Sequence, residues 1–154
     1  MYIFDLDDTI IMHNNNLVYE NIEEDKDLSY LLKELNGKKY IYSNGTIGHV
    51  NKVITNMKLN DNIFEKKYAR DIIPYMKPYI ESFQYVDRDI KYINHINNCI
   101  FFDDLKENLF SAKKIGWKTV WINKEYHNKE NYMDYSFIDL KTALIYFNKL
   151  DIIK

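Results

Sequence analysis

The sequence has little net charge and almost no cysteine. Its 154 residues carry a formal net charge of −2 at pH 7, which gives no electrostatic footprint for nucleic acid or for an anionic membrane. Cys99 is the only cysteine, and it lies in an apolar run. We therefore expect a small buried core residue, a reducing compartment and a cytoplasmic location.

Long apolar runs, repeats and linkers are missing as well. No apolar run approaches the length that a helix needs to cross a bilayer, and the acidic stretch that begins at residue 5 leaves no room for a signal peptide before it. The apolar content of 46% and the charged content of 29% are ordinary for a soluble globular protein. We expect a single domain over residues 1–154, with a three-layer core and no membrane partner.

The chain is organised around a short strand that ends in acids. Residues 2–4 form an apolar, aromatic and β-branched run, typical of a strand buried on both faces, and Asp5, Asp7 and Asp8 follow it. In open α/β sheets, ligands bind at the carboxyl ends of the strands. Carboxylates this close repel one another unless a cation lies between them. A solvated acidic turn is the usual interpretation, but it does not explain the lack of a polar spacer.

Strands and helices alternate along the chain. Short apolar runs predict strands over residues 39–42, 99–102 and 117–122, and a further short strand around 68–73. Apolar residues at helical spacing predict helices over 23–35, around 50–57, from Pro78 onward, around 109–115 and over 137–147. Residues 10–20 predict a hairpin around an Asn-rich turn, placed over the acids. The alternation indicates an α/β fold, a Rossmann-like three-layer sandwich with a central parallel sheet.

Three of these strands end in polar residues of complementary kinds. If the strands are parallel neighbours, their ends converge on one pocket that holds carboxylates, a hydroxyl and an ammonium group. Hard oxygen ligands suit Mg²⁺, and a cation beside a Lys and a Ser favours a phosphoryl group. Taken alone, the Lys is typical of an exposed helix end and the Ser-Asn pair of an N-cap. The residues are Asp5 and Asp7, Ser43 and Asn44, Asp103 and Asp104, and Lys77 from a fourth element.

These segments resemble, in order, the motifs of the haloacid dehalogenase superfamily of aspartate-nucleophile phosphatases. The matching segments are Phe4–Thr9, Tyr42–Gly45, Lys77-Pro78 and Phe101–Asp104. Ordered motifs are more specific than any one of them. The interval 43–122 is most similar to the branch of pyrimidine 5′-nucleotidases and nucleoside-monophosphate phosphatases.

The resemblance implies a Mg²⁺-dependent phosphomonoester hydrolase that works through an aspartyl-phosphate. It implies Asp5 as the nucleophile, Asp7 as the general acid and base, and Lys77 as the cation that neutralises nucleophile and phosphate. Dehalogenating relatives lack an Asp two residues after the nucleophile, so Asp7 favours hydrolysis of a phosphate ester. It further implies that Asp5, Asp104 and the Asp7 carbonyl hold Mg²⁺, with Asp103 acting through a water. Ser43, the backbone N–H of Asn44 and Lys77 would bind the phosphoryl oxygens, and Thr9 and Asn108 would support the site.

The sequence also departs from the family pattern. Leu105 stands where many relatives carry Ser, and Lys66 or Lys67 are alternatives for the third-motif lysine. The interval between the first two motifs leaves room only for a hairpin flap and one helix over residues 10–36. We therefore expect a member without a large cap domain.

Two alternatives to a nucleotidase remain open. The first is a phosphatase that acts on a phosphorylated macromolecule, either a phosphoprotein or a polynucleotide end, in place of a nucleotide-like small molecule. The second is a catalytically idle binding module that meets a partner through its tyrosine-rich surface, since a fold alone never excludes this. Intact Asp5, Asp7 and Lys77 argue against the idle module.

Overall fold

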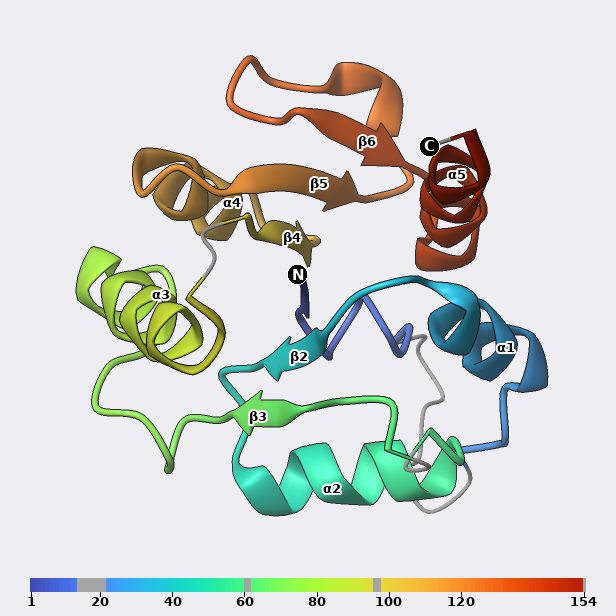
Figure 1. Ribbon diagram of the computed structural model, residues 1–154, viewed down its shortest axis with the longest axis horizontal. Coiled ribbons are helices and arrows are strands. Elements are labelled where there is room, and N and C mark those ends of the chain that lie inside the picture. The colour runs from blue at the N-terminus through green and yellow to red at the C-terminus, as the bar shows by residue number, and fades with distance from the viewer. Residues whose placement is uncertain (14–21, 60–61, 96–97, 154) are drawn as a thin grey trace.

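The computed structural model describes residues 1–13, 22–59, 62–95 and 98–153. Within these ranges, six parallel strands form one sheet in the order β3-β2-β1-β4-β5-β6 (Figure 1). The predicted α/β fold with a central parallel sheet is confirmed. The strands are β1 (Tyr2–Phe4), β2 (Lys39–Tyr42), β3 (Lys66–Tyr68), β4 (Ile100–Asp103), β5 (Lys118–Ile122) and β6 (Tyr135–Phe137). The helices are α1 (Lys26–Glu34), α2 (Ile47–Asn56), α3 (Ile80–Asn94), α4 (Lys106–Lys114), the short 3₁₀ turn η2 (Tyr126–Asn128) and α5 (Leu140–Ile153).

The first strand lies in the middle of the sheet. β1 pairs with β2 on one side and with β4 on the other, so that Phe4 stands opposite Ile41 and Phe102. All its residues are buried, as expected for a strand that packs on both faces. The residues that follow β1 are therefore placed at the centre of the carboxyl edge of the sheet.

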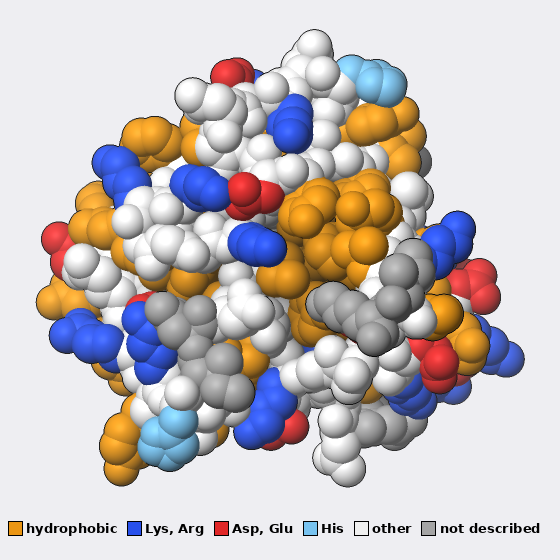
Figure 2. Space-filling view, turned by 45° about the horizontal axis from the view of Figure 1, so that its top comes forward, with side chains coloured by type: hydrophobic (Ala, Val, Ile, Leu, Met, Phe, Trp, Pro, Cys, Tyr) orange, Lys and Arg blue, Asp and Glu red, His pale blue; other side chains and the backbone are white. Residues whose placement is uncertain are grey.

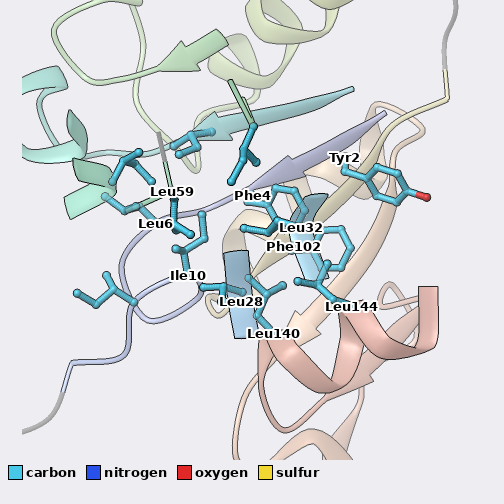
Figure 3. Packing of buried hydrophobic residues seen from close by; sticks show 14 of the residues in the cluster. Tyr2, Phe4, Leu6, Ile10, Leu28, Leu32, Leu59, Phe102, Leu140 and Leu144 are labelled. Carbon is cyan, nitrogen blue, oxygen red and sulfur yellow. The ribbon is translucent and has the colours of Figure 1, made fainter. Parts of the chain in front are cut away.

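The two faces of the sheet bury separate cores. Neighbouring residues of a strand point to opposite faces, so Phe4 belongs to one core and Ile3 to the other. In the first core, Phe4 stacks on Phe102 with ring centroids 4.7 Å apart, and both pack with Leu28 of α1 and Leu144 of α5 (Figure 3). Helices α3 and α4 cover the second core on the opposite face (Figure 1). The predicted three-layer arrangement is thus confirmed.

The third strand differs from its predicted position. It covers Lys66–Tyr68, whereas a strand was expected around residues 68–73. After Tyr68 the chain turns, because the N–H groups of Ile72 and Ile73 both donate to the carbonyl oxygen of Ala69. Because these N–H groups bond within the turn, residues 69–73 do not extend β3.

The helix expected to open at Pro78 begins at Ile80 instead. The N–H and the carbonyl oxygen of Lys77 both bond to the side chain of Asn44. Because these groups are committed outside the helix, Lys77 and Pro78 belong to the connection before α3. The prediction of a first-turn proline was wrong.

The end of the chain also departs from the prediction. Residues 135–137 form β6, a strand that was not predicted, and the last helix covers Leu140–Ile153 where residues 137–147 were expected. The three residues of β6 are only partly buried at the edge of the sheet. A short edge strand of this kind carries no continuous apolar run in its sequence.

In the described part of the chain, the interval between β1 and β2 holds α1 and no cap domain. The Asp25 side chain caps α1 by accepting from the N–H of Leu28, which sets its start later than the predicted residue 23. The predicted hairpin over residues 10–20 lies largely outside the described residues.

The surface in Figure 2 carries charged side chains of both signs around a group of hydrophobic ones. Apolar side chains at the surface are normal in globular proteins. Among the helices that the structure describes, none combines the length and the apolar character needed to cross a bilayer.

Candidate active site

Neighbouring strands bring the predicted polar residues to one cavity. Strands β2, β1 and β4 lie side by side, and their carboxyl ends carry Ser43, Asp5 and Asp103. The cavity there has a volume of about 190 Å³. Its lining includes most of the predicted site residues: Asp5, Asp7, Ser43, Asn44, Lys77, Asp104 and Asn108, together with Asp8, Gly45 and Leu105. The remaining two, Asp103 and Thr9, are buried beside these acids.

The ammonium group of Lys77 ties the strand ends together. Its Nζ donates to Asp5 Oδ1 at 2.9 Å, to Asp103 Oδ2 at 2.9 Å and to the carbonyl oxygen of Tyr42 at 2.8 Å. Lys77 is only 3% exposed. Burial favours the neutral amine, but the two carboxylates outweigh it and raise the pKa of Lys77 above that of an ordinary lysine. The site therefore contains a fixed ammonium whose positive charge the two carboxylates stabilise.

The two alternative lysines of the third motif lie elsewhere. Both belong to β3, where Lys66 pairs with Asp89 and Lys67 donates to Asn51. Neither lines the cavity. The structure thus places Lys77, and not these residues, against the nucleophile candidate.

Asn44 fixes the backbone of Lys77. Its Nδ2 donates to the Lys77 carbonyl oxygen, and its Oδ1 accepts from the Lys77 N–H, each at 2.9 Å. From the sequence, only the backbone N–H of Asn44 was expected to act, as a phosphoryl ligand. The side-chain role was missed because the partner is 33 residues away.

Three carboxylates cluster beside the ammonium. Asp5, Asp103 and Asp104 each offer an oxygen, and these oxygens lie within 4.8 Å of one another. Burial first, and then the Asp103 charge, raise the pKa of Asp5 to about 6, while Lys77 opposes the rise. Burial and the charges of Asp103 and Asp5 raise the pKa of Asp104 to about 9. These shifts indicate that the cluster favours additional positive charge.

The donor set fits the predicted Mg²⁺. All ligand atoms offered are hard carboxylate oxygens, which this ion prefers. Asp103 is nevertheless occupied on both oxygens, since Oδ2 accepts from Lys77 and Asn108 and Oδ1 accepts from the Leu105 N–H. The role of Asp103 at the metal stays a prediction.

Thr9 and Asn108 hold the acids in place. The Thr9 hydroxyl donates to Asp5 Oδ2 at 3.3 Å, and Asn108 Nδ2 donates to Asp103 Oδ2 at 3.0 Å. Thr9 reaches Asp5 because the turn after β1 is folded around the carbonyl oxygen of Leu6, which accepts from the N–H groups of residues 9, 10 and 11. Asp5 thus has one oxygen bound by Lys77 and the other by Thr9.

Ser43 lines the cavity from the end of β2. Its hydroxyl oxygen accepts from the Gly45 N–H at 3.0 Å, which orients it in the loop before α2. Thr46 then caps α2 by accepting from the N–H of His49. The loop therefore presents a hydroxyl to the cavity that Lys77 also lines.

Asp7 stands at the open side of the cavity, with its side chain 35% exposed. Its Oδ1 lies 2.6 Å from His13 Nε2 and 3.1 Å from His49 Nε2. Sequence reasoning assigned no role to either histidine. The signal that could have found His49 is its place in the first turn of the helix that follows the Ser43 loop.

No family model matches the chain. Solved structures of similar fold do match it. An L-2-haloacid dehalogenase from Xanthobacter autotrophicus with chloropropionic acid covalently bound superposes with a TM-score of 0.63 and 18% identity, over 82% of this chain and 62% of that one. The haloacid dehalogenase-like hydrolase SP0104 from Streptococcus pneumoniae gives 0.62 and 19%, over 80% and 59%. The putative hydrolase YfnB from Bacillus subtilis, bound to magnesium, gives 0.65 and 18%, over 80% and 54%.

The chain has the haloacid dehalogenase fold. At these identities the likeness establishes the fold and not the reaction. The chain spans less than two thirds of the length of each of these structures. Within this haloacid dehalogenase fold, the acid cluster occupies the carboxyl edge of the central strands, where α/β sheets bind ligands.

Proposed function

We propose that the protein is a Mg²⁺-dependent phosphomonoester hydrolase that works through an aspartyl-phosphate on Asp5. The observation that carries the proposal is that Asp5 and Asp7 line one cavity with Lys77 and Ser43. This cavity combines a nucleophile, a second carboxylate able to exchange protons, and donors for phosphoryl oxygens. Those are the groups that hydrolysis of a phosphate ester requires.

In the first step, the Asp5 carboxylate attacks phosphorus and the bond between phosphorus and the ester oxygen breaks. Asp7 gives its proton to the departing oxygen, so the alcohol leaves neutral. Ser43 and the backbone N–H of Asn44 would donate to the phosphoryl oxygens. Lys77 would neutralise their charge, since its three N–H groups already bond to Asp5, Asp103 and the Tyr42 carbonyl. In the second step, Asp7 takes a proton from a water whose oxygen attacks phosphorus, and the bond between phosphorus and the Asp5 oxygen breaks. Inorganic phosphate is released and the Asp5 carboxylate is restored.

The residues that would hold Mg²⁺ are Asp5, Asp104 and the backbone carbonyl of Asp7, with Asp103 acting through a water. The ion, when bound, supplies positive charge to the phosphoryl group. The raised pKa values of Asp5 and Asp104 support this assignment, because burial and the neighbouring carboxylates raise them and a bound cation would offset both effects.

Dehalogenation is the competing reaction, because solved structures with this fold include L-2-haloacid dehalogenases. A carboxylate nucleophile on Asp5 would suit that reaction as well. A halide, however, is a weak base and leaves without a proton, whereas an alkoxide does not. Asp7 therefore has a task in phosphate ester hydrolysis and none in halide displacement.

Nucleoside monophosphates are the substrates we favour. A second hollow of about 490 Å³ adjoins the cavity that Asp5 and Lys77 line, and the two share Asp8 and Asp104. It offers apolar contact through Met12 and Ile122 and polar groups through Asn123. A sugar and a base attached to the phosphate would find both kinds of contact there.

One feature supports a larger substrate as the second candidate. Tyr75 and Tyr79 are 49% and 67% exposed, and both lie within two residues of Lys77. Exposed aromatic residues beside a site provide contact area for a macromolecule. A phosphoprotein or a polynucleotide end extends beyond the cavity and could contact them, since neither tyrosine belongs to the cavity lining.

A panel of substrates tests the proposal. Phosphate release would be measured from nucleoside monophosphates, an aryl phosphate, a phosphopeptide and a 5′-phosphorylated oligonucleotide, with Mg²⁺ and with a chelator. Chloride release from 2-chloropropionate would be measured in parallel. We expect phosphate release that depends on Mg²⁺ and is lost in Asp5→Asn. Chloride release without phosphate release would establish a dehalogenase, and no product from any compound would favour the idle binding module.

A further inference from the structure

Two histidines from separate segments lie beside Asp7, the general acid of the proposed reaction. His13 Nε2 lies 2.6 Å from Asp7 Oδ1. His49 Nε2 lies 3.1 Å from the same oxygen and 3.2 Å from Oδ2. His13 follows the acidic turn after β1, and His49 belongs to α2. Both carboxylate oxygens of Asp7 therefore have an imidazole nitrogen in reach.

His49 is built into this position by its surroundings. A Cβ on Gly45 would lie 2.7 Å from His49 Cδ2, closer than two such carbons approach. The φ of Gly45 is outside the left-handed region, so the backbone conformation does not require glycine there. The space that glycine leaves is what lets the imidazole approach the loop.

The backbone around His49 is fixed as well. Its N–H donates to the hydroxyl of Thr46, which caps α2. The N–H of Ile47 donates to Asp71 Oδ1 at 2.8 Å, and the N–H of Arg70 donates to the Gly45 carbonyl oxygen at 2.9 Å. The imidazole thus projects from a helix end that bonds to a second loop.

A carboxylate at the edge of a cavity rotates among several orientations when it makes a single hydrogen bond. Hydrogen bonds on more than one side restrict this rotation. Asp7 is partly exposed, so solvent and packing leave its carboxylate freer than that of the buried Asp5. Proton transfer requires the donor oxygen within hydrogen-bond reach of the leaving oxygen. The imidazoles of His13 and His49 lie within hydrogen-bond distance of the Asp7 oxygens and can supply these bonds.

We propose that His13 and His49 are positioning residues that hold the Asp7 carboxylate in the orientation from which it protonates the leaving group. The proposal rests on the proposed phosphatase function. It assigns the histidines no contact with the substrate and no proton of their own in the reaction. Their effect is therefore specific to the step in which Asp7 acts.

This specificity gives a measurable signature. An ester with a basic leaving group, such as an alkyl phosphate, depends on protonation by Asp7, whereas 2,4-dinitrophenyl phosphate releases a weak base that needs no proton. We expect His49→Phe to lower kcat/KM for alkyl phosphates at least about tenfold, a part of the 10²–10⁴ that general acid catalysis supplies. The same change should leave kcat/KM for the dinitrophenyl ester within about twofold. His49→Gln, whose amide N–H can occupy the place of Nε2, should restore most of the loss.

The experiment is a series of esters that spans a wide range of leaving-group pKa. The quantity measured is the slope of log kcat/KM against that pKa, for the wild type and for His49→Phe, His49→Gln, His13→Phe, Asp7→Asn and the double variant Asp7→Asn/His49→Phe. Thermal unfolding of each variant reports its fold. The value of kcat/KM covers the steps up to formation of the aspartyl-phosphate, so a slow second step does not mask the effect.

We expect a steeper negative slope in His49→Phe and in His13→Phe, the steepest slope in Asp7→Asn, and no further change in the double variant. An equal loss for every ester would show that the histidines only support the fold, and would overturn the proposal. A faster reaction in His49→Phe would show that the histidines hold Asp7 away from the substrate. That outcome would also overturn the proposal. If His49→Phe does not fold, the slope of His13→Phe decides, because His13 lies in a partly exposed segment. A wild-type protein that releases no phosphate from any ester would refute the proposed function itself.

Discussion

The side chain of Asn44 and the backbone of Lys77 form a reciprocal pair of hydrogen bonds, each 2.9 Å long. The pair joins the loop after β2 to the connection before α3, and it sets the point from which the Lys77 side chain enters the site. Because Lys77 Nζ bridges Asp5 and Asp103, any shift of its backbone is passed to the nucleophile.

Asn44→Ala removes both hydrogen bonds and leaves a partly buried N–H and carbonyl of Lys77 to find water. We expect a loss of about 1–3 kcal/mol in the free energy of unfolding. We also expect a loss of at least about tenfold in kcat/KM, because a displaced ammonium no longer meets the phosphoryl group. Denaturant unfolding and phosphate release measure the two effects. Asn51→Ala is the matched control, since Asn51 bonds to Lys67 at an exposed position. Wild-type kinetics in Asn44→Ala would remove this link from the mechanism.

Asp5→Asn should abolish turnover and leave the fold intact. The two side chains are nearly isosteric, and an amide oxygen can still accept from Lys77, but a neutral amide is not a nucleophile for phosphorus. We expect a loss of at least about a thousandfold in phosphate release, which corresponds to roughly 4 kcal/mol of transition-state stabilisation. The control is Asp27→Asn in the first turn of α1, outside the cavity. Substantial turnover by a folded Asp5→Asn protein would exclude Asp5 as the nucleophile.

The metal-free protein should lose stability as the pH rises. The folded state holds protons on Asp5 up to a pKa of about 6 and on Asp104 up to about 9, whereas unfolded carboxyls release theirs near 3.8. The folded state therefore binds more protons across this window, and the free energy of unfolding falls with pH. The stabilisation that these protons give the folded state is complete below the unfolded pKa. It is lost as the pH rises through about 6 for Asp5 and then about 9 for Asp104.

Mg²⁺ should remove most of this dependence, because a bound cation takes the place of the protons. We expect the melting temperature of the metal-free protein to decrease between pH 5 and pH 9, and saturating Mg²⁺ to raise it most at the alkaline end. Asp104→Asn should flatten the metal-free profile and weaken the effect of Mg²⁺. A metal-free profile that rises with pH, or one that Mg²⁺ leaves unchanged, would contradict the assignment of the cluster as a cation site.

The fold could be predicted from the sequence because its strands carry local signals. Residues 2–4 and the strands at 39–42 and 99–102 are apolar runs closed by polar residues, and parallel pairing places such ends together. β6 gave no such signal, because its three residues are partly exposed at the sheet edge. The start of α3 was misplaced because Lys77 is held by a residue distant in sequence.

The residues that make up the site could also be predicted from the sequence. Asp5, Ser43 and Asp103 stand directly at strand ends, so their meeting follows from the topology. The contacts that orient these residues do not follow from the topology, because those contacts join separate segments. Asn44 bonds to a backbone 33 residues away, and His49 reaches Asp7 across 42 residues. Such pairs become visible only when the fold places the segments side by side. The roles assigned to these residues remain predictions.

Access to the cavity should determine how selective the reaction is. Between β1 and β2, the described residues form α1 and no domain that could close over Asp5. Enzymes that close over small substrates gain contacts remote from the reacting group, and those contacts raise selectivity. An open site lacks them. We therefore expect kcat/KM for several nucleoside monophosphates and an aryl phosphate to agree within about tenfold, with Michaelis constants near or above the upper end of the usual range of about 1 μM–1 mM.

A macromolecular substrate should behave differently, because it can touch the exposed Tyr75 and Tyr79 beyond the cavity. If a phosphopeptide or a phosphorylated oligonucleotide is turned over, Tyr79→Ala should lower its kcat/KM by about tenfold and leave that of an aryl phosphate unchanged, since one aromatic contact contributes roughly 1–2 kcal/mol. Tyr92→Ala is the control, because Tyr92 is 83% exposed on α3 and lies outside the cavity. Strong selectivity for one small nucleotide, in a protein shown to be monomeric by light scattering, would contradict the open site. In that case contacts around the hollow beside Asp8 and Asn123 would have to supply the selectivity.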